Sequence, residues 1–333
     1  MRTRAGGLKV AIVLTALIIT VLTSFAYRGM YERTRKHDSG AHVIFAVARH
    51  EVQFIEEWLQ YHLLLGFTHF HIYNQDEDSE QHLIPNKLRE YMKSGLVSVI
   101  PWRVGDQRGA YLHALENYAP LVKSLAFLDV DEFFVFKRAA RVQEISRRLG
   151  LSSNKVCLAF SWLNYGHSYA DAQMVREKGV LRSLTCRASD IEHTHPGKIM
   201  LRGGTHNLVD GFKISLLKLP GWHDCSSYTE KYSLVDSADA YIAHYQLRHG
   251  NESLSARVRR GMQGDFTGQI MYSQLSLEAF SNRNAVKDLT LAVFSEQAEK
   301  RLAQDTKFHS IFGLFRHTFL HQSVKSLSSS SCK

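Results

Sequence analysis

The chain has 333 residues, of which 44% are hydrophobic and 22% are charged. These proportions are typical of a folded globular protein and exclude an intrinsically disordered one. The formal net charge is +9, but the basic residues are dispersed and lack the interleaved aromatic residues of an RNA-binding sheet, so we expect no nucleic-acid partner. The length suits one large α/β domain, with or without a helical appendage.

The N-terminal part predicts a membrane anchor. Residues 1–9 form a basic tail, and residues 10–27 contain no charged side chain. As a helix, this run of about eighteen residues would span roughly 27 Å, about the thickness of a thin bilayer. We expect an uncleaved transmembrane signal-anchor, and a cleaved signal peptide is the alternative. Positive charges flank the run on both sides, so they do not decide its orientation.

Residues 28–41 are polar and form an expected stem, after which apolar runs and helical periodicities alternate. Four apolar runs predict strands, at residues 42–47, 68–73 and 97–101 and in the run that enters Asp129. Three helices are expected between them, at residues 51–65, 83–93 and 107–124. Such alternation indicates a parallel sheet with helices on both faces.

The pattern loosens after Asp131. A helix is expected over residues 140–149, a strand over 156–162, and two further helices over 253–261 and 284–302. We therefore divide the chain into a main α/β domain at residues 42–250, a C-terminal helical part at 251–322 and a Ser-rich disordered tail at 323–333.

The strongest chemical signal is the stretch from Leu125 to Phe134. An apolar run ends in two carboxylates, Asp129 and Asp131, and apolar residues follow at once. Burying such charges costs several kcal/mol unless they are paired, and hard oxygen ligands suit Mg²⁺ or Mn²⁺. The carboxyl end of a strand is also where α/β sheets bind ligands. The stretch therefore predicts a metal site, whereas an isolated Asp-x-Asp is more often a solvated strand end.

The motifs around this pair, in their order and spacing, resemble glycosyltransferase family 92 and related family-2-like enzymes over roughly residues 42–260. The similarity lies in Arg49-His50-Glu51, Glu57-Trp58 with His62 and Gly66, Gln107, Asp129 to Phe133, Trp162 to His167, Lys198-Ile199, His206, and His244-Tyr245 with Arg248. Two features depart from that pattern. His50 stands where the family usually has Asn, and the loop at residues 74–79 lacks the usual arrangement of Asn and Asp.

The resemblance implies a GT-A type, Rossmann-like mixed sheet. It also implies a divalent-metal-dependent transfer of a sugar from a nucleotide-diphosphate donor, with UDP-galactose suggested, to a glycan or other hydroxyl acceptor with inversion. Mn²⁺ or Mg²⁺ would bind Asp129 and Asp131, with His244 completing the metal shell. The donor site would comprise Arg49, Glu51, Asp76, Asp78, Gln107, Lys198 and Arg248.

An inverting transferase needs a general base for the acceptor hydroxyl. The candidates are Asp190, Glu192, Asp210 and Asp224, and the last two are preferred because they follow His206.

Several of these side chains also have a plain structural interpretation. His244 fits a buried histidine bonded to backbone, and Asp76 and Asp78 fit an exposed acidic turn. Trp58 and His62 lie four residues apart on one helix face and are interpreted as core packing. For Glu132, orientation of a basic neighbour is the alternative to catalysis.

The expected setting is the secretory pathway, as a single-pass type II protein with a lumenal catalytic domain in the Golgi. The glycosylation sequon at Asn251 fits a lumenal body. The cysteines show no zinc-type spacing, and one disulfide plus a free thiol is possible among Cys157, Cys186 and Cys225.

Two other functions remain open. A non-catalytic pseudo-transferase would bind sugars without turnover. A metal-dependent phosphoesterase would use the same acids with a second metal cluster, for which the segment from His193 to His195 offers ligands.

Overall fold

The computed structural model describes residues 40–204, apart from 138, 140, 152–154, 169, 190 and 191, and then residues 232–246, 248 and 285–292. The expected anchor, the helix expected at 253–261 and the C-terminal tail lie outside these ranges. Within them, no helix combines the length and the apolar character needed to cross a membrane.

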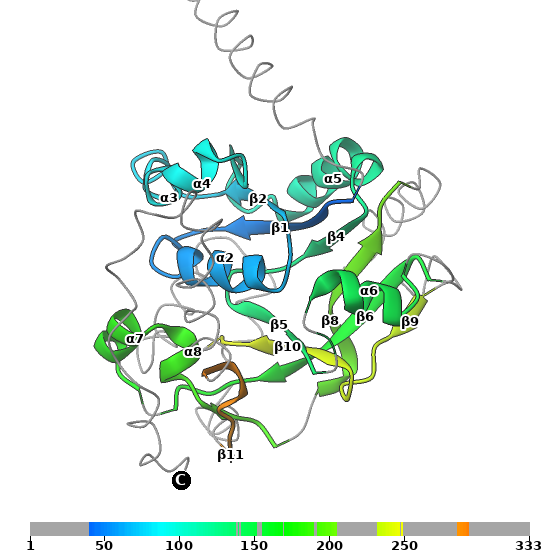
Figure 1. Ribbon diagram of the computed structural model, residues 1–333. Helices are drawn as coiled ribbons and strands as arrows, with labels where there is room; N and C mark the ends of the chain where they lie inside the picture. Colours follow the sequence, from blue (N-terminus) through cyan, green and yellow to red (C-terminus); the bar gives the residue numbers. More distant parts are fainter. Residues whose placement is uncertain are drawn as a thin grey trace, which may run out of the picture. The chain divides into compact units, whose positions relative to one another are not determined.

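One large mixed sheet organises the described chain. Its strands are β1 (His42–Ala48), β2 (His69–Asn74), β3 (Val97–Pro101), β4 (Ser124–Phe127), β5 (Glu132–Phe136), β6 (Cys157–Asn164), β8 (Glu192–Arg202), β9 (Tyr232–Leu234) and β10 (Ala240–His244). They follow the order β3-β2-β1-β4-β8-β6-β10-β5, with β9 paired to β6. Figure 1 shows β2, β1, β4 and β6 following one another down the molecule.

The strand directions place most strand ends at one edge of this sheet. Strands β1 to β4 pair in parallel. Strand β8 runs antiparallel to both β4 and β6, so β6 again runs with β4. Strand β10 is parallel to β6, and β5 returns antiparallel beside it. The carboxyl ends of β1, β2, β4, β6 and β10 therefore share one edge, and ligands bind open α/β sheets at such an edge.

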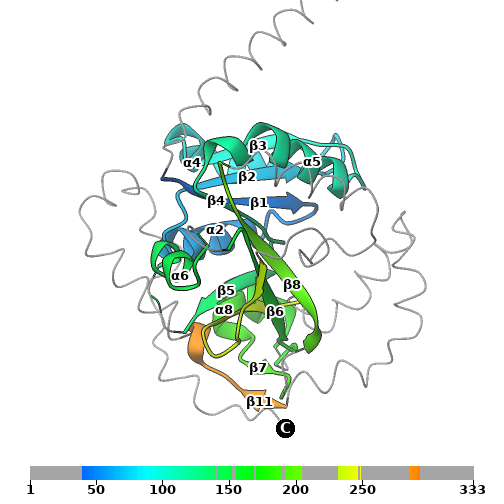
Figure 2. The same cartoon turned by 90° about the vertical axis from the view of Figure 1, so that its right-hand side faces the viewer.

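Helices cover both faces of the sheet. They are α2 (Ile55–Leu64), α3 (Leu83–Lys87), α4 (Arg89–Lys93), α5 (Gln107–Asn117), η1 (Ala119–Leu121), α6 (Val142–Arg148), α7 (Ala172–Lys178) and α8 (Val180–Ser183). Helix α2 packs Trp58 against Phe70 on one face. Helix α5 packs Tyr111 against Phe127 on the other, and Figure 2 shows the two helices on opposite sides of β1.

The prediction of Trp58 and His62 as core residues is confirmed, because both side chains are fully buried. The four N-terminal strands lie within two residues of their expected bounds. The helix expected over residues 83–93 is interrupted at Leu88, which separates α3 from α4.

The prediction of a helix over residues 284–302 is wrong for the start of that segment. Strand β11 (Val286–Lys287) instead pairs antiparallel with β7 (Cys186–Arg187), and Asp288 forms an ion pair with Arg187 at 2.8 Å. A tertiary pairing with a distant strand therefore overrides the local helical pattern of this segment.

Buried neutral histidines predict a loss of stability in mild acid. Burial lowers the pKa of His62 to about 3, against an ordinary value of about 6.5 in the unfolded chain. Between these values the unfolded state binds the proton and the folded state does not, so stability falls as the pH falls. For His62 alone, the free energy of unfolding should drop by about 1.4 kcal/mol from pH 7.5 to pH 5.5.

Urea unfolding measured across this pH range checks the prediction in wild type and in His62→Gln. The variant keeps a donor and an acceptor and should show a shallower slope. Burial also lowers the pKa of His42, to about 4, so part of the slope should remain. Equal slopes for wild type and variant would contradict the role of His62.

Candidate active site at the carboxyl edge of the sheet

The Asp-x-Asp stretch forms a tight turn between β4 and β5. The Glu132 backbone N–H donates to the Asp129 carbonyl oxygen at 3.1 Å, and the Asp129 N–H donates to Glu132 Oε2 at 2.9 Å. The Trp58 indole of α2 donates to the Glu132 carbonyl at 2.9 Å. The turn is thus fixed from both sides, and it presents Asp129 and Asp131 at the shared edge.

Glu132 is fully buried beneath this turn. Its Oε1 accepts a hydrogen bond from Trp162 Nε1 at 2.8 Å. Burial raises the pKa of Glu132 well above its ordinary value, and the charges of Asp129 and Asp131 raise it further against the opposing effect of Lys198. The position of Glu132 beside Lys198 matches the orienting role that the sequence suggests for it.

Lys198 reaches the turn from β8. Its Nζ lies 2.7 Å from Asp129 Oδ2 and 3.5 Å from Glu132 Oε2, and its side chain is 2% exposed. Burial alone would lower the pKa of Lys198, but the neighbouring carboxylates outweigh burial and raise it. Lys198 is therefore a charged internal partner of Asp129.

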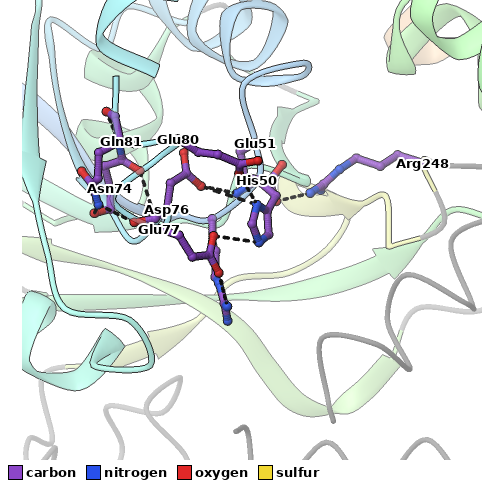
Figure 3. Close-up of polar contacts among 9 residues, drawn as sticks. His50, Glu51, Asn74, Asp76, Glu77, Glu80, Gln81 and Arg248 are labelled. Carbon is purple, nitrogen blue, oxygen red and sulfur yellow. Dashed lines mark hydrogen bonds and ion pairs between the residues drawn. The ribbon is translucent and has the colours of Figure 1, made fainter. Parts of the chain in front are cut away.

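Arg248 takes the corresponding position beside Asp131. Its guanidinium lies 3.1 Å from Asp131 Oδ2, forms an ion pair with Glu51 and stacks over Phe54. Figure 3 shows Arg248 reaching Glu51, which follows β1. This buried arginine ties the end of β1 to the Asp-x-Asp turn.

The ion pairs of the turn share two cations among several acids. Among the described residues, Lys198 and Arg248 contact four carboxylates, those of Glu51, Asp129, Asp131 and Glu132. Buried charge requires compensation. A proton on Glu132 or a divalent cation would add to the compensation that these two side chains provide.

His244, at the end of β10, is the third expected metal ligand. Its Nε2 lies 3.8 Å from Asp131 Oδ2, a separation that one ion bonded to both atoms at about 2.1 Å can bridge. Asp129 is one-third exposed, and its Oδ1 accepts a 3.4 Å contact from Gln107 within the described part of the chain. Asp131 and His244 therefore fit a divalent cation, with Asp129 beside it.

A second set of metal-ligating groups lies after β1 and β2. Within the described residues, the three-group set whose ligand atoms all fall within 4.8 Å comprises His50, Asp76 and Glu80. Asp129, Asp131 and His244 are not drawn together that closely in this structure.

The loop after β2 carries acidic residues of the part of the site that is expected to contact the nucleoside. Figure 3 shows His50 among Asp76, Glu77 and Glu80. Asp76 is buried and accepts the His50 backbone N–H at 2.6 Å, and burial raises its pKa. His50 has a φ of 58°, in the left-handed region that Asn enters readily, which accounts for the interchange of Asn and His here.

The remaining predicted residues have different surroundings. Arg49 pairs with Glu77 at 2.7 Å, and Asp78 is exposed. Asp210 and Asp224 lie outside the described residues, as does Asp190, and nothing is described of the Glu192 side chain. The sequence assigned no role to Trp162 or Asn164, which end β6 at the same edge. A polar residue after an apolar strand was the available signal.

The sequence profile of glycosyltransferase family 92 matches residues 45–265. A family 92 protein of Ricinus communis is 27% identical over 145 residues, which cover 43% of this chain and 26% of that protein. A family 92 protein of Oryza sativa subsp. japonica is 21% identical over 157 residues, which cover 47% and 26%. The match thus spans about a quarter of each relative. The chain belongs to glycosyltransferase family 92.

Solved structures overlap with this chain only loosely. A Pyrobaculum calidifontis mannosyltransferase in complex with GDP-Man and Mn²⁺ has a TM-score of 0.37 and 11% identity, covering 92% of this chain and 87% of its own. S. aureus TarS, residues 1–349, has a TM-score of 0.36 and 10% identity, covering 86% and 77%. Overlaps of this size do not define the ligands of this chain.

The buried Arg248 bridge predicts a large stability effect. Arg248→Met should lower the free energy of unfolding by about 3 kcal/mol or more, because it removes the buried cation that Glu51 and Asp131 share. Adding Glu51→Gln should cost less than the sum of the single losses, because the two groups interact directly.

Urea unfolding of the two single variants and the double variant measures this coupling. Arg103→Met is the matched control, since Arg103 is 81% exposed and faces Asp106 at 3.6 Å. Its effect should stay within about 0.5 kcal/mol. Additive losses at Arg248 and Glu51 would show that the bridge does not form.

Proposed function

We propose that this protein transfers a sugar from a nucleotide-diphosphate donor to a hydroxyl of a glycan or glycoconjugate. The observation that carries the proposal is the Asp129–Asp131 turn, which lies at the edge shared by the parallel strand ends, where the buried Lys198 and Arg248 form ion pairs with its two carboxylates. Membership of family 92 supports the same reaction class. UDP-galactose is the first donor to test.

Asp131 and His244 would hold a Mn²⁺ or Mg²⁺ ion, with Asp129 completing the site. When bound, such an ion acts as a Lewis acid on the diphosphate leaving group. Lys198 and Arg248 form ion pairs with Asp129 and Asp131 that orient these carboxylates, and both basic side chains are almost fully buried. Their positive charges add to the potential that favours a diphosphate above them.

The loops after β1 and β2 are the proposed nucleoside side of the site. Asp76 is held by the His50 N–H, and Arg49 by Glu77, so both are positioned before a ligand arrives. Gln107, at the start of α5, lies within 3.4 Å of Asp129 and would adjoin the diphosphate.

The acceptor base remains a proposal for Asp210 or Asp224, with inversion at the transferred carbon. Glu132 is unsuited to this role, because it is buried and both of its oxygens already accept N–H groups of the protein. A base must reach the proton that it removes.

The catalytic prediction is loss of donor turnover in Asp129→Asn and Asp131→Asn, by at least about 100-fold, because charge stabilisation of the leaving group is lost. Release of nucleoside diphosphate from a panel of UDP- and GDP-sugars measures it, with and without EDTA and added Mn²⁺. Asp171→Asn is the control, since Asp171 caps α7 and Asn caps helices as well.

The outcomes separate the alternatives. Binding of a donor without turnover would indicate a pseudo-transferase, and release of phosphate from phosphoesters instead of sugar transfer would indicate a phosphoesterase. Full activity after EDTA treatment would contradict the metal proposal and leave Lys198 and Arg248 as the cations of the site.

We further propose a lumenal setting for the catalytic domain, with residues 10–27 as a type II anchor. The supporting observation is that both cysteines of the described ranges, Cys157 and Cys186, are disulfide-bonded. Structural disulfides persist in oxidising compartments and are rare in the cytosol.

Expression of the full chain in a eukaryotic secretory system tests this setting. The chain should stay with membranes at alkaline pH and carry an endoglycosidase-sensitive glycan that Asn251→Gln removes. Cytosolic recovery of an unglycosylated, reduced chain would contradict the proposal.

A further inference from the structure

One buried polar side chain at the site edge is not used by the chemistry described so far. Asn164 ends β6 and is 3% exposed. Its Oδ1 has no hydrogen-bond partner among the described residues. If the oxygen and nitrogen of the carboxamide exchanged places, the NH₂ group would occupy the same unpaired position. Buried polar groups are normally paired, so an orphan of this kind suggests a ligand.

The sheet register places Asn164 beside the proposed metal ligand. Strands β6 and β10 are parallel, with Asn164 opposite His244. Side chains two residues apart in a strand share a face, so Asn164 lies on the face of Trp162. The Trp162 ring packs 4.8 Å from the His244 ring, which identifies this face as the one that meets the site.

Trp162 forms a fixed, partly exposed wall next to Asn164. Its Nε1 is held by Glu132, and a Cβ added at Gly197 would overlap its indole ring, so a glycine at this point of β8 makes room for it. An aromatic wall with a convergent polar group is typical of small-ligand sites. A sugar offers both an apolar C–H face and hydroxyl groups to such a site.

The order of the strands matches the order of groups in a nucleotide sugar. Along the edge come the loops after β2 and β1, then Asp129 and Asp131 after β4, then the ends of β6 and β10. Strand β8 alone lies between β4 and β6 in this order, so β4 and β6 are about 10 Å apart. Nucleoside, diphosphate and sugar would lie along the edge in this sequence.

We propose that the Asn164 carboxamide binds a hydroxyl of the transferred sugar and that Trp162 supports the sugar ring. This inference rests on the proposed function, and it assigns sugar selectivity to the end of β6. The nucleoside and diphosphate contacts lie on other strands and do not depend on Asn164.

The test compares the nucleotide sugar selected by the donor screen with the corresponding nucleoside diphosphate, both titrated into wild type and Asn164→Ala. The variant should bind the nucleotide sugar about three- to tenfold more weakly, the effect of one lost hydrogen bond. Its affinity for the nucleoside diphosphate should change by less than about twofold. Asn86→Ala, an exposed amide that contacts Arg89, should change neither affinity.

Deoxy donors identify the hydroxyl that is bound. Removal of that hydroxyl should weaken binding to wild type but not weaken binding to Asn164→Ala any further. Asn164→Ser provides the same comparison if the alanine variant unfolds at a lower temperature than wild type.

Equal loss of affinity for the nucleotide sugar and the nucleoside diphosphate would overturn the assignment of Asn164 and leave the proposed function intact. The assignment would also be overturned if every deoxy donor weakened binding to the Asn164 variants by as much as it weakens binding to wild type. Absence of any nucleotide or nucleotide-sugar binding by wild type would instead defeat the proposed function itself.

Discussion

The site depends on compensation of the negative charge of three acidic side chains that lie close together after the end of β4. Asp129, Asp131 and Glu132 are close enough to repel one another, and Glu132 has no access to water. Lys198 and Arg248 meet them from elements far away in the sequence. Because an uncompensated buried charge costs several kcal/mol, these ion pairs restrict how β8 and the segment after β10 dock.

The mixed sheet is compatible with that requirement. A purely parallel sheet would present strand ends alone at the ligand edge, whereas antiparallel β8 passes between β4 and β6 and brings the middle of a strand to the acidic turn. Lys198 can therefore lie beneath Asp129 with its charge buried. The return strand β5 starts at Glu132 and places the third carboxylate under the turn.

Local pattern was sufficient for the first half of the fold. The apolar runs of β1 to β4 and the 3.6-residue period of α2 depend on neighbouring residues, and the structure follows them closely. Prediction from local pattern failed where strand pairing is distant in sequence. Residues Val286–Lys287 are an example, because their strand partner lies about a hundred residues earlier. The acids of the site were also visible locally, because charges that interrupt an apolar strand are rare.

The sequence by itself determined the N-terminal elements and the acidic turn, because each depends on residues near one another in the chain, and it determined membership of the family through the order and spacing of its motifs. The tertiary structure decided which charges meet. Arg248 contacts both Glu51 and Asp131, and Asn164 lies opposite His244. Such pairings follow from strand order and direction, which are set by the packing of the whole sheet and not by any local pattern.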